Sequence, residues 1–148
     1  AFQGCSKLTS VTIDNSVTSI GEGAFSGCNH LTSFVFGSSV TSIRTYAFQN
    51  CLKLTNVNAP NVTSIGSYAF HSCSKLTTII LRSQTLCTLS STNAFNSSPF
   101  ASNGTGGTVY VPQALIEQYQ TATNWSTLYA SGKCNFVAIE GSEYDDSN

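Results

Sequence analysis

Residues 24–43 read AFSGCNHLTSFVFGSSVTSI, and close variants of this stretch occur along most of the chain. The element Ala-Phe-x-x-Cys that opens it also stands at residues 1–5, 47–51 and 69–73, and residues 94–98 begin a degenerate fifth copy. The repeated phenylalanines stand at positions 2, 25, 48, 70 and 95, so the steps between them are 23, 23, 22 and 25 residues. A repeat of this length predicts a solenoid, in which each coil buries its apolar face against its neighbours.

Each coil is expected to contribute two short extended segments. Val11-Thr12-Ile13 alternates apolar and polar residues, which is typical of a strand with one buried face, and equivalent segments should pair in parallel along one side of the solenoid. A second apolar pair follows, as at Val17 and Ile20, and Ala-Phe-x-x-Cys should form a tight helical turn with its phenylalanine inward. The predicted inward rows are Leu8, Leu31, Leu54, Leu76; Val11, Phe34, Val57, Ile79; and Ile13, Phe36, Ala59, Leu81.

The repeats give way to a different pattern near the C-terminus. We divide the chain into four repeats over residues 1–93 (starting at 1, 24, 47 and 69), a degenerate fifth repeat with a C-terminal cap over 94–140, and an acidic, mobile tail over 141–148. Within the cap, Val109 and Val111 should face inward on a strand, and Pro112 should begin a helix. Asn124 should cap a second short helix, with a last strand over 136–139. Solenoids need such a unit to close the end of the core.

Composition excludes several classes of function. Charged residues make up only 9% of the 148 residues, against about 25% in a typical protein, and the net charge is −1. This balance argues against nucleic-acid partners, and no apolar run is long enough to insert into a membrane. Polarity supplied by Ser, Thr and Asn favours a secreted or cell-surface β-rich protein. Because the chain starts within a repeat, we expect it to be the C-terminal piece of a longer protein.

The repeat unit A-F-x-x-C-x-x-L-x-x-V-x-I-x-x-S-V-T-S-I-G resembles the bacterial-surface leucine-rich repeats of the BspA-like type. The resemblance covers residues 1 to about 93, where each anchor position is met in at least three of the four coils. It implies a leucine-rich-repeat fold and the binding of extracellular ligands. It implies no catalytic residues, because the family has none in common.

Four of the six cysteines occupy one column of the repeat: Cys5, Cys28, Cys51 and Cys73. We interpret them as a ladder of small, buried, unpaired residues. Neighbours one coil apart would lie about 4.8 Å from each other, which is long for the roughly 3.8 Å between the Cβ atoms of a disulfide. A straight row also does not converge on a metal ion, so no metal site is expected. Cys87 and Cys134 are the remaining candidates for a pair.

Residues suited to catalysis are few and scattered. The two histidines, His30 and His71, occupy different repeat positions, and acids in the repeats are limited to Asp14 and Glu22. A nucleophile, a base and an orienting group must lie within hydrogen-bond reach of one another. No column supplies such a set, so we predict a non-catalytic protein without cofactors.

The outward positions of the predicted sheet are the favoured binding site. They are Ser10, Thr12, Ser33, Val35, Asn56, Asn58, Thr78 and Ile80, with Tyr110 at the cap end. A flat, uncharged, mixed polar and apolar face of this kind suits a protein partner, so we predict an adhesion module that binds host or extracellular-matrix protein. The alternatives are a carbohydrate-binding module that uses the exposed Tyr46, Tyr68 and Tyr110, and a structural spacer within a larger surface protein.

Overall fold

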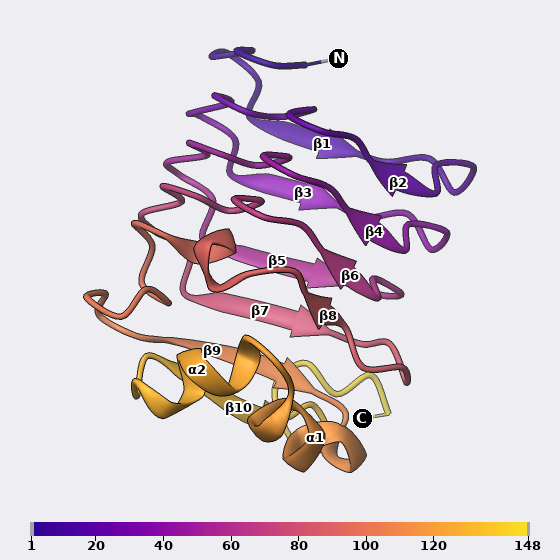
Figure 1. The fold of residues 1–148 in the computed structure, drawn as a ribbon. Coiled ribbons are helices and arrows are strands. Elements are labelled where there is room, and N and C mark those ends of the chain that lie inside the picture. Colours follow the sequence, from indigo (N-terminus) through magenta and orange to yellow (C-terminus); the bar gives the residue numbers. More distant parts are fainter. Residues whose placement is uncertain (1, 148) are drawn as a thin grey trace.

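The computed structural model describes residues 2–147 and shows a solenoid of stacked coils (Figure 1). Each repeat contributes two short strands, and these form two ladders that run along the stack. The strands are β1 (Ser10–Thr12), β2 (Ser19–Ile20), β3 (Ser33–Val35), β4 (Ser42–Ile43), β5 (Asn56–Ala59), β6 (Ser64–Ile65), β7 (Thr78–Leu81) and β8 (Thr88–Leu89). All pairings are parallel and join equivalent repeat positions, so the predicted fold and register are confirmed.

The ladder of odd-numbered strands consists of two parts, whereas a single sheet was expected. β1 pairs with β3, and β5, β7, β9 (Gly107–Val111) and β10 (Cys134–Ala138) form a separate four-stranded sheet. The Phe34 ring of β3 stands perpendicular to the Phe48 ring at 4.8 Å, whereas the inward positions of β5 hold the smaller Val57 and Ala59. The break in the ladder therefore lies where the bulk of the inward side chains changes from one coil to the next.

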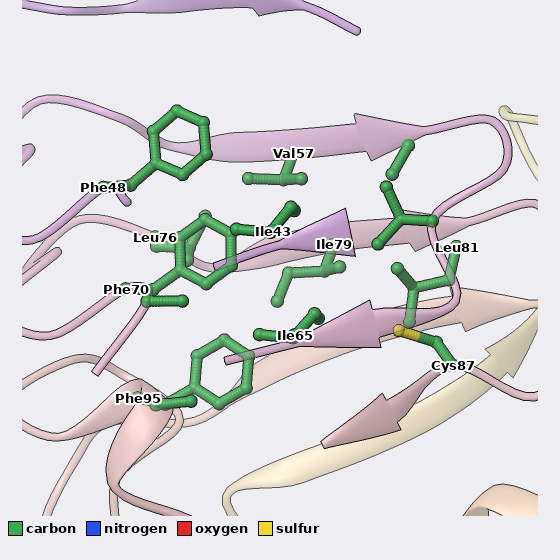
Figure 2. Close-up of a cluster of buried hydrophobic side chains, with 14 of the residues drawn as sticks. Ile43, Phe48, Val57, Ile65, Phe70, Leu76, Ile79, Leu81, Cys87 and Phe95 are labelled. Carbon is green, nitrogen blue, oxygen red and sulfur yellow. The ribbon is translucent and has the colours of Figure 1, made fainter. Parts of the chain in front are cut away.

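The Ala-Phe turns form a third column of contacts between coils. The five repeated phenylalanines stack nearly parallel, with ring centroids 5.4–5.7 Å apart, and Figure 2 shows three of them above one another. The backbone N–H groups of Phe25 and Gly27 donate to the carbonyls of Ala47 and Gln49 in the next coil, at 2.8 and 2.7 Å. The turns therefore hold neighbouring coils together in addition to the strand pairings, and they do so also where β3 and β5 do not pair.

The core is sealed in the middle of the stack and open at the first coil. The inward residues of the middle coils, such as Leu54, Val57 and Phe70, are almost fully buried. In the first coil Leu8 and Val11 are only half-buried, and 49% of the Phe2 surface is exposed. This gradient follows from position, because each residue of the first coil contacts a neighbouring coil on one side only.

The C-terminal unit packs across the other end of the stack (Figure 1). It contains the 3₁₀ turns η1 (Thr92–Phe95) and η2 (Gln113–Leu115), the helices α1 (Ile116–Thr121) and α2 (Trp125–Ala130), and strands β9 and β10. Val109 and Val111 are buried as expected, and Pro112 directly precedes η2. The prediction that the Asn124 side chain caps α2 is wrong. The Asn124 backbone is left-handed with φ 69°, and its side-chain amide donates to the Leu89 carbonyl at 2.7 Å.

Side chains of the C-terminal unit also form hydrogen bonds with backbone groups in and beside β8, the last strand of the even-numbered ladder. The Cys87 N–H donates to the Tyr119 hydroxyl at 2.7 Å, and the Trp125 indole N–H donates to the Cys87 carbonyl at 2.7 Å. With Asn124 on Leu89, three side chains bind backbone groups in and beside β8, which would otherwise be an open edge. Trp125 itself is fully buried and lies 5.9 Å from the Phe95 ring.

Within residues 2–147, none of the helices has the length and apolarity needed to cross a bilayer.

Candidate functional site

The predicted sheet face is exposed over its first three strands. Ser10, Thr12, Ser33, Val35, Asn56 and Asn58 all project from the odd-numbered strands and are solvent-exposed. Val35 is the most apolar of them, and 52% of its surface is accessible. Exposed threonines precede the same strands and extend the face: Thr9, Thr32, Thr55 and Thr77. The strands thus place an uncharged surface of hydroxyls, amides and one valine side by side.

The same face is covered over its last strands, and the predicted role of Ile80 as an exposed site residue is wrong. Ile80 pairs with Asn58 and Tyr110 in the outward column but is only 1% exposed. The Tyr110 ring packs against Tyr144 with centroids 4.7 Å apart. Thr78 is half-buried. The predicted surface is therefore exposed from β1 to β5, buried at Ile80 of β7, and covered by Tyr144 at Tyr110 of β9.

Arg82, which sequence reasoning missed, anchors the segment of residues 141–147 to the sheet. Its Nη1 donates to the Tyr144 carbonyl at 2.9 Å and forms an ion pair with Asp146 at 3.2 Å, while its Nε donates to Asn58 Oδ1 at 2.9 Å. Residues 141–148 are predicted to be an acidic, mobile tail; the described part forms a series of turns bonded to Arg82, directly after β7, and Asn148 lies outside the described residues. No local signal in the sequence marks this ion pair, because Asp146 stands 64 positions after Arg82.

The acidic segment is organised around Asp145. Its carboxylate accepts hydrogen bonds from the Gly141 N–H at 2.8 Å and from the Ser147 N–H and hydroxyl at 2.9 and 2.6 Å. These bonds favour the charged form and lower the pKa of Asp145 to about 2. The Asp145 carboxylate is therefore charged at neutral pH.

Tyr46 and Tyr68 lie on a different side of the solenoid, just before two Ala-Phe turns. Their rings stack with centroids 5.2 Å apart and an angle of 7°. Both have left-handed backbones, with φ 60° and 57°, and Gly23 has φ 64° at the equivalent position one coil earlier. A left-handed residue with a side chain costs about 1–2 kcal/mol, which a glycine avoids. The presence of Gly23 in this column was the signal in the sequence that could have revealed the unusual backbone.

The cysteine ladder is a hydrogen-bonded column. The thiols of Cys28, Cys51 and Cys73 donate to the carbonyls of Phe2, Phe25 and Phe48 in the preceding coil, at 3.2, 3.3 and 3.0 Å. These three cysteines are fully buried, and all six cysteines of the chain are free, including Cys87 and Cys134. Cys5 is only half-buried, which corrects the expectation that the whole column is inaccessible.

Burial shifts the acidity of the thiols away from reactivity. It raises the pKa of Cys87 and of Cys134 to about 12, and it raises the pKa of Cys73 well above the usual value. Neutral thiols are poor nucleophiles and poor metal ligands. The three thiols are therefore protonated at neutral pH and pack within the core.

The histidines lie beside amides and hydroxyls. His30 Nδ1 is 3.0 Å from Asn29 Oδ1, and His71 Nδ1 is 3.3 Å from Ser72 Oγ and 3.4 Å from Gln49 Nε2. Among residues 2–147, no three His, Cys, Asp or Glu side chains are grouped so that they could hold a metal ion.

Comparison with known proteins agrees with this architecture. The family model of the BspA type leucine rich repeat region matches residues 1–111 in six copies. The chain belongs to this family. Leucine-rich repeats of this type are protein-interaction or structural modules, and that description holds for this member.

Two solved structures resemble this leucine-rich repeat chain. A leucine-rich repeat protein of T. pallidum shares 29% identity with a TM-score of 0.63, over 74% of this chain and 49% of that one. A leucine-rich cell surface protein of Faecalibacterium prausnitzii A2-165 shares 34% identity with a TM-score of 0.60, over 66% of this chain and 25% of that one. The chain thus spans about half the length of the first protein and a quarter of the second. No curated protein matches the sequence.

Proposed function

We propose that this leucine-rich repeat chain is a non-catalytic adhesion module at the cell surface, which binds a host or extracellular-matrix protein through the free part of its sheet face. The observation that carries the proposal is the exposed Val35, which stands among hydroxyl and amide side chains on a surface built by β1, β3 and β5. The cell-surface description of the F. prausnitzii protein supports the location.

The chemistry of this face suits a protein partner. A partner that covers Val35 would gain about 25 cal/mol for each Å² of apolar surface removed from water. The surrounding hydroxyls and amides can form direct or water-bridged hydrogen bonds with a partner backbone. A stable protein interface buries about 800 Å² on each side, so the partner would also contact the exposed threonine column that begins at Thr9 and Thr32.

The covered part of the face sets the boundary of the proposed site. Ile80 is buried and Tyr110 packs against Tyr144 of the C-terminal segment, so the partner would approach from the first coil and end near Asn58. The six free outward side chains carry no formal charge. Binding should therefore change by less than about twofold between roughly 0.05 and 0.5 M salt.

The test is the double variant Val35→Glu with Asn56→Lys, which places two charges on the free face without changing the net charge. Thr18→Glu with Thr41→Lys is the matched control, because both threonines are exposed beside the even-numbered strands. Binding to immobilised collagen, laminin and fibronectin is measured by surface plasmon resonance, with circular dichroism as a check of folding. We expect the first pair to lose at least about tenfold in affinity and the control to bind normally.

Two outcomes would overturn the proposal. One is unchanged binding by a folded Val35→Glu, Asn56→Lys variant, which would remove the sheet face as the site. The other is failure of the unmodified chain to bind any of the three proteins, which would remove a matrix partner of this kind.

A further inference from the structure

A shallow pocket of about 380 Å³ opens between the turns of the first three coils, on a side of the solenoid that the proposed protein-binding face does not use. Its lining residues are Gln3, Glu22, Gly23, Ser26, Tyr46 and Gln49, and we call it the tyrosine slot. We propose that the tyrosine slot binds one neutral sugar ring, stacked on the face of Tyr46.

The slot is a vacant place in a column of stacked rings. Gly23, Tyr46 and Tyr68 occupy the same position in successive coils, and one face of Tyr46 is already covered by Tyr68 at 5.2 Å. At the other side the column holds Gly23, where an added Cβ atom would meet nothing within 4 Å. A third ring in register would therefore lie over Tyr46, in the space that the lining residues enclose.

The backbone shows that tyrosine is a costly choice at this position. Gly23 adopts φ 64° without penalty, whereas Tyr46 at φ 60° and Tyr68 at φ 57° hold bulky side chains in the left-handed region. Strained residues of this kind persist where the surrounding structure over-determines them, and they cluster at binding sites. Stacking of Tyr46 on Tyr68 offsets part of the strain. It uses one face of the Tyr46 ring and leaves the other face available for a ligand.

Polar groups around the slot match the hydroxyls of a sugar. Glu22 and Gln3 are exposed at its rim, and the buried Ser26 hydroxyl donates to Gln49 Oε1 at 3.3 Å. Carboxylate and amide oxygens accept hydrogen bonds from hydroxyl groups, and the amide N–H₂ groups donate to them. A pyranose presents an apolar C–H face to an aromatic ring and hydroxyls at its edge, so it satisfies both parts of the slot. An aromatic side chain would cover Tyr46 but would offer no hydroxyl groups to Gln3 and Glu22 at the rim.

Charge selects among sugars. Glu22 is the single formally charged residue of the six that line the slot. An anionic sugar such as a sialic acid would be repelled by this carboxylate, whereas a neutral hexose would not. A single stacked ring in an open pocket should bind with a dissociation constant on the order of 1 mM.

The experiment uses two opposite substitutions in the full chain. Tyr46→Gly removes the stacking face and places the residue of the first coil in the second, where glycine adopts the same left-handed φ, so we expect the fold to be kept. Gly23→Tyr keeps every lining side chain but fills the slot with a third ring, at a φ that Tyr46 shows to be tolerated. Asn50→Gly is the control, because it relieves another left-handed residue, with φ 60°, outside the slot.

A glycan array first ranks neutral and acidic glycans. Binding of lactose and sialyllactose is then measured by saturation-transfer NMR and by titration. We expect the unmodified chain and Asn50→Gly to bind lactose or the best neutral glycan alike. Both Tyr46→Gly and Gly23→Tyr should lose at least about tenfold in affinity, and sialyllactose should bind more weakly.

Three results would overturn the inference: absence of any neutral-glycan binding by the unmodified chain, unchanged binding by a folded Gly23→Tyr variant, or preference for acidic glycans. Since the slot and the sheet face are changed by different substitutions, loss of matrix-protein binding in Val35→Glu, Asn56→Lys leaves this result unaffected. The two proposals therefore fail separately.

Discussion

Within residues 2–147, the outermost coils differ: the first coil is open on its outer side, whereas the C-terminal unit covers the last coil. In the first coil Phe2 is half-exposed and Val11 half-buried, and nothing lies on their outer side within the described residues 2–147. At the other end Trp125 covers Phe95, and the side chains of Tyr119 and Trp125 bind the backbone of Cys87. The difference shows that a solenoid coil reaches full burial only when both of its faces are covered.

The largest expected effect comes from removing the cover. Trp125→Ala should lower the free energy of unfolding by about 3–5 kcal/mol, because a fully buried indole leaves a cavity and an unpaired Cys87 carbonyl. Phe2→Ala at the open end should cost about 1 kcal/mol, since half of that ring is already in water. Urea titration followed by circular dichroism measures both. Equal losses would show that the two ends are equivalent after all.

A smaller effect is expected inside the stack, at the thiol column. Cys51→Ala should cost about 1–2 kcal/mol, because it removes a buried side chain and its hydrogen bond to the Phe25 carbonyl. Cys5→Ala, in the half-buried first coil, should cost less than about 0.5 kcal/mol. Cys51→Ser separates the two roles: if the hydrogen bond matters, serine should be better tolerated than alanine. A serine variant that is the less stable of the two would favour packing alone.

Alkaline pH should distinguish the two ends by chemistry. Iodoacetamide at about pH 8 should modify Cys5 and spare Cys73, Cys87 and Cys134, which mass spectrometry of the native protein would show. Burial raises the pKa of Cys87 and Cys134 from 9.0 to about 12, so the unfolded chain loses these protons first. Their contribution to stability is therefore complete below pH 9 and falls as the pH rises toward 12. A flat melting temperature across this range would contradict the assignment.

The smallest effect on global stability is expected from acid release of the C-terminal segment. The pKa of Asp145 is lowered from 3.8 to about 2, so its stabilising bonds are present above about pH 4 and are lost as the pH falls through 2. Hydrogen exchange of residues 141–147 should then accelerate, and Tyr110 and Ile80 should become accessible. Asp145→Asn should produce the same opening at neutral pH. If exchange stays slow in both cases, the contacts of Arg82 and Tyr110 hold the segment without Asp145.

Sequence periodicity predicts whatever repeats in this molecule. The inward rows, both sets of strands and the parallel register recur in each coil, so four noisy copies reinforce one pattern. Contacts that occur at only one place in the fold could not be predicted from the repeat pattern. The cover over Ile80, the Arg82–Asp146 pair and the amide of Asn124 on Leu89 each join residues far apart in the chain, and no periodic position marks them.

The same distinction applies to the candidate sites: their repeated features could be predicted, and the features that depend on a single long-range contact could not. The free sheet face follows from alternation in β1, β3 and β5, whereas its limit at β7 depends on the tertiary position of Tyr144. The thiol hydrogen bonds were missed because cysteine reads as a small apolar residue in a buried column, although its S–H is also a weak donor.

The hydrogen bonds between turns have a mechanical consequence. Each links one coil only to the next, as from Phe25 to Ala47, so a pull along the axis of the stack would load the coils in series. The boundary between the second and third coils, where β3 and β5 do not pair, would separate before the others. The C-terminal unit, held by Trp125 and Tyr119, would yield last. Under shear between two surfaces, such a chain would lengthen in small steps and dissipate energy at each one, while the C-terminal unit stayed folded.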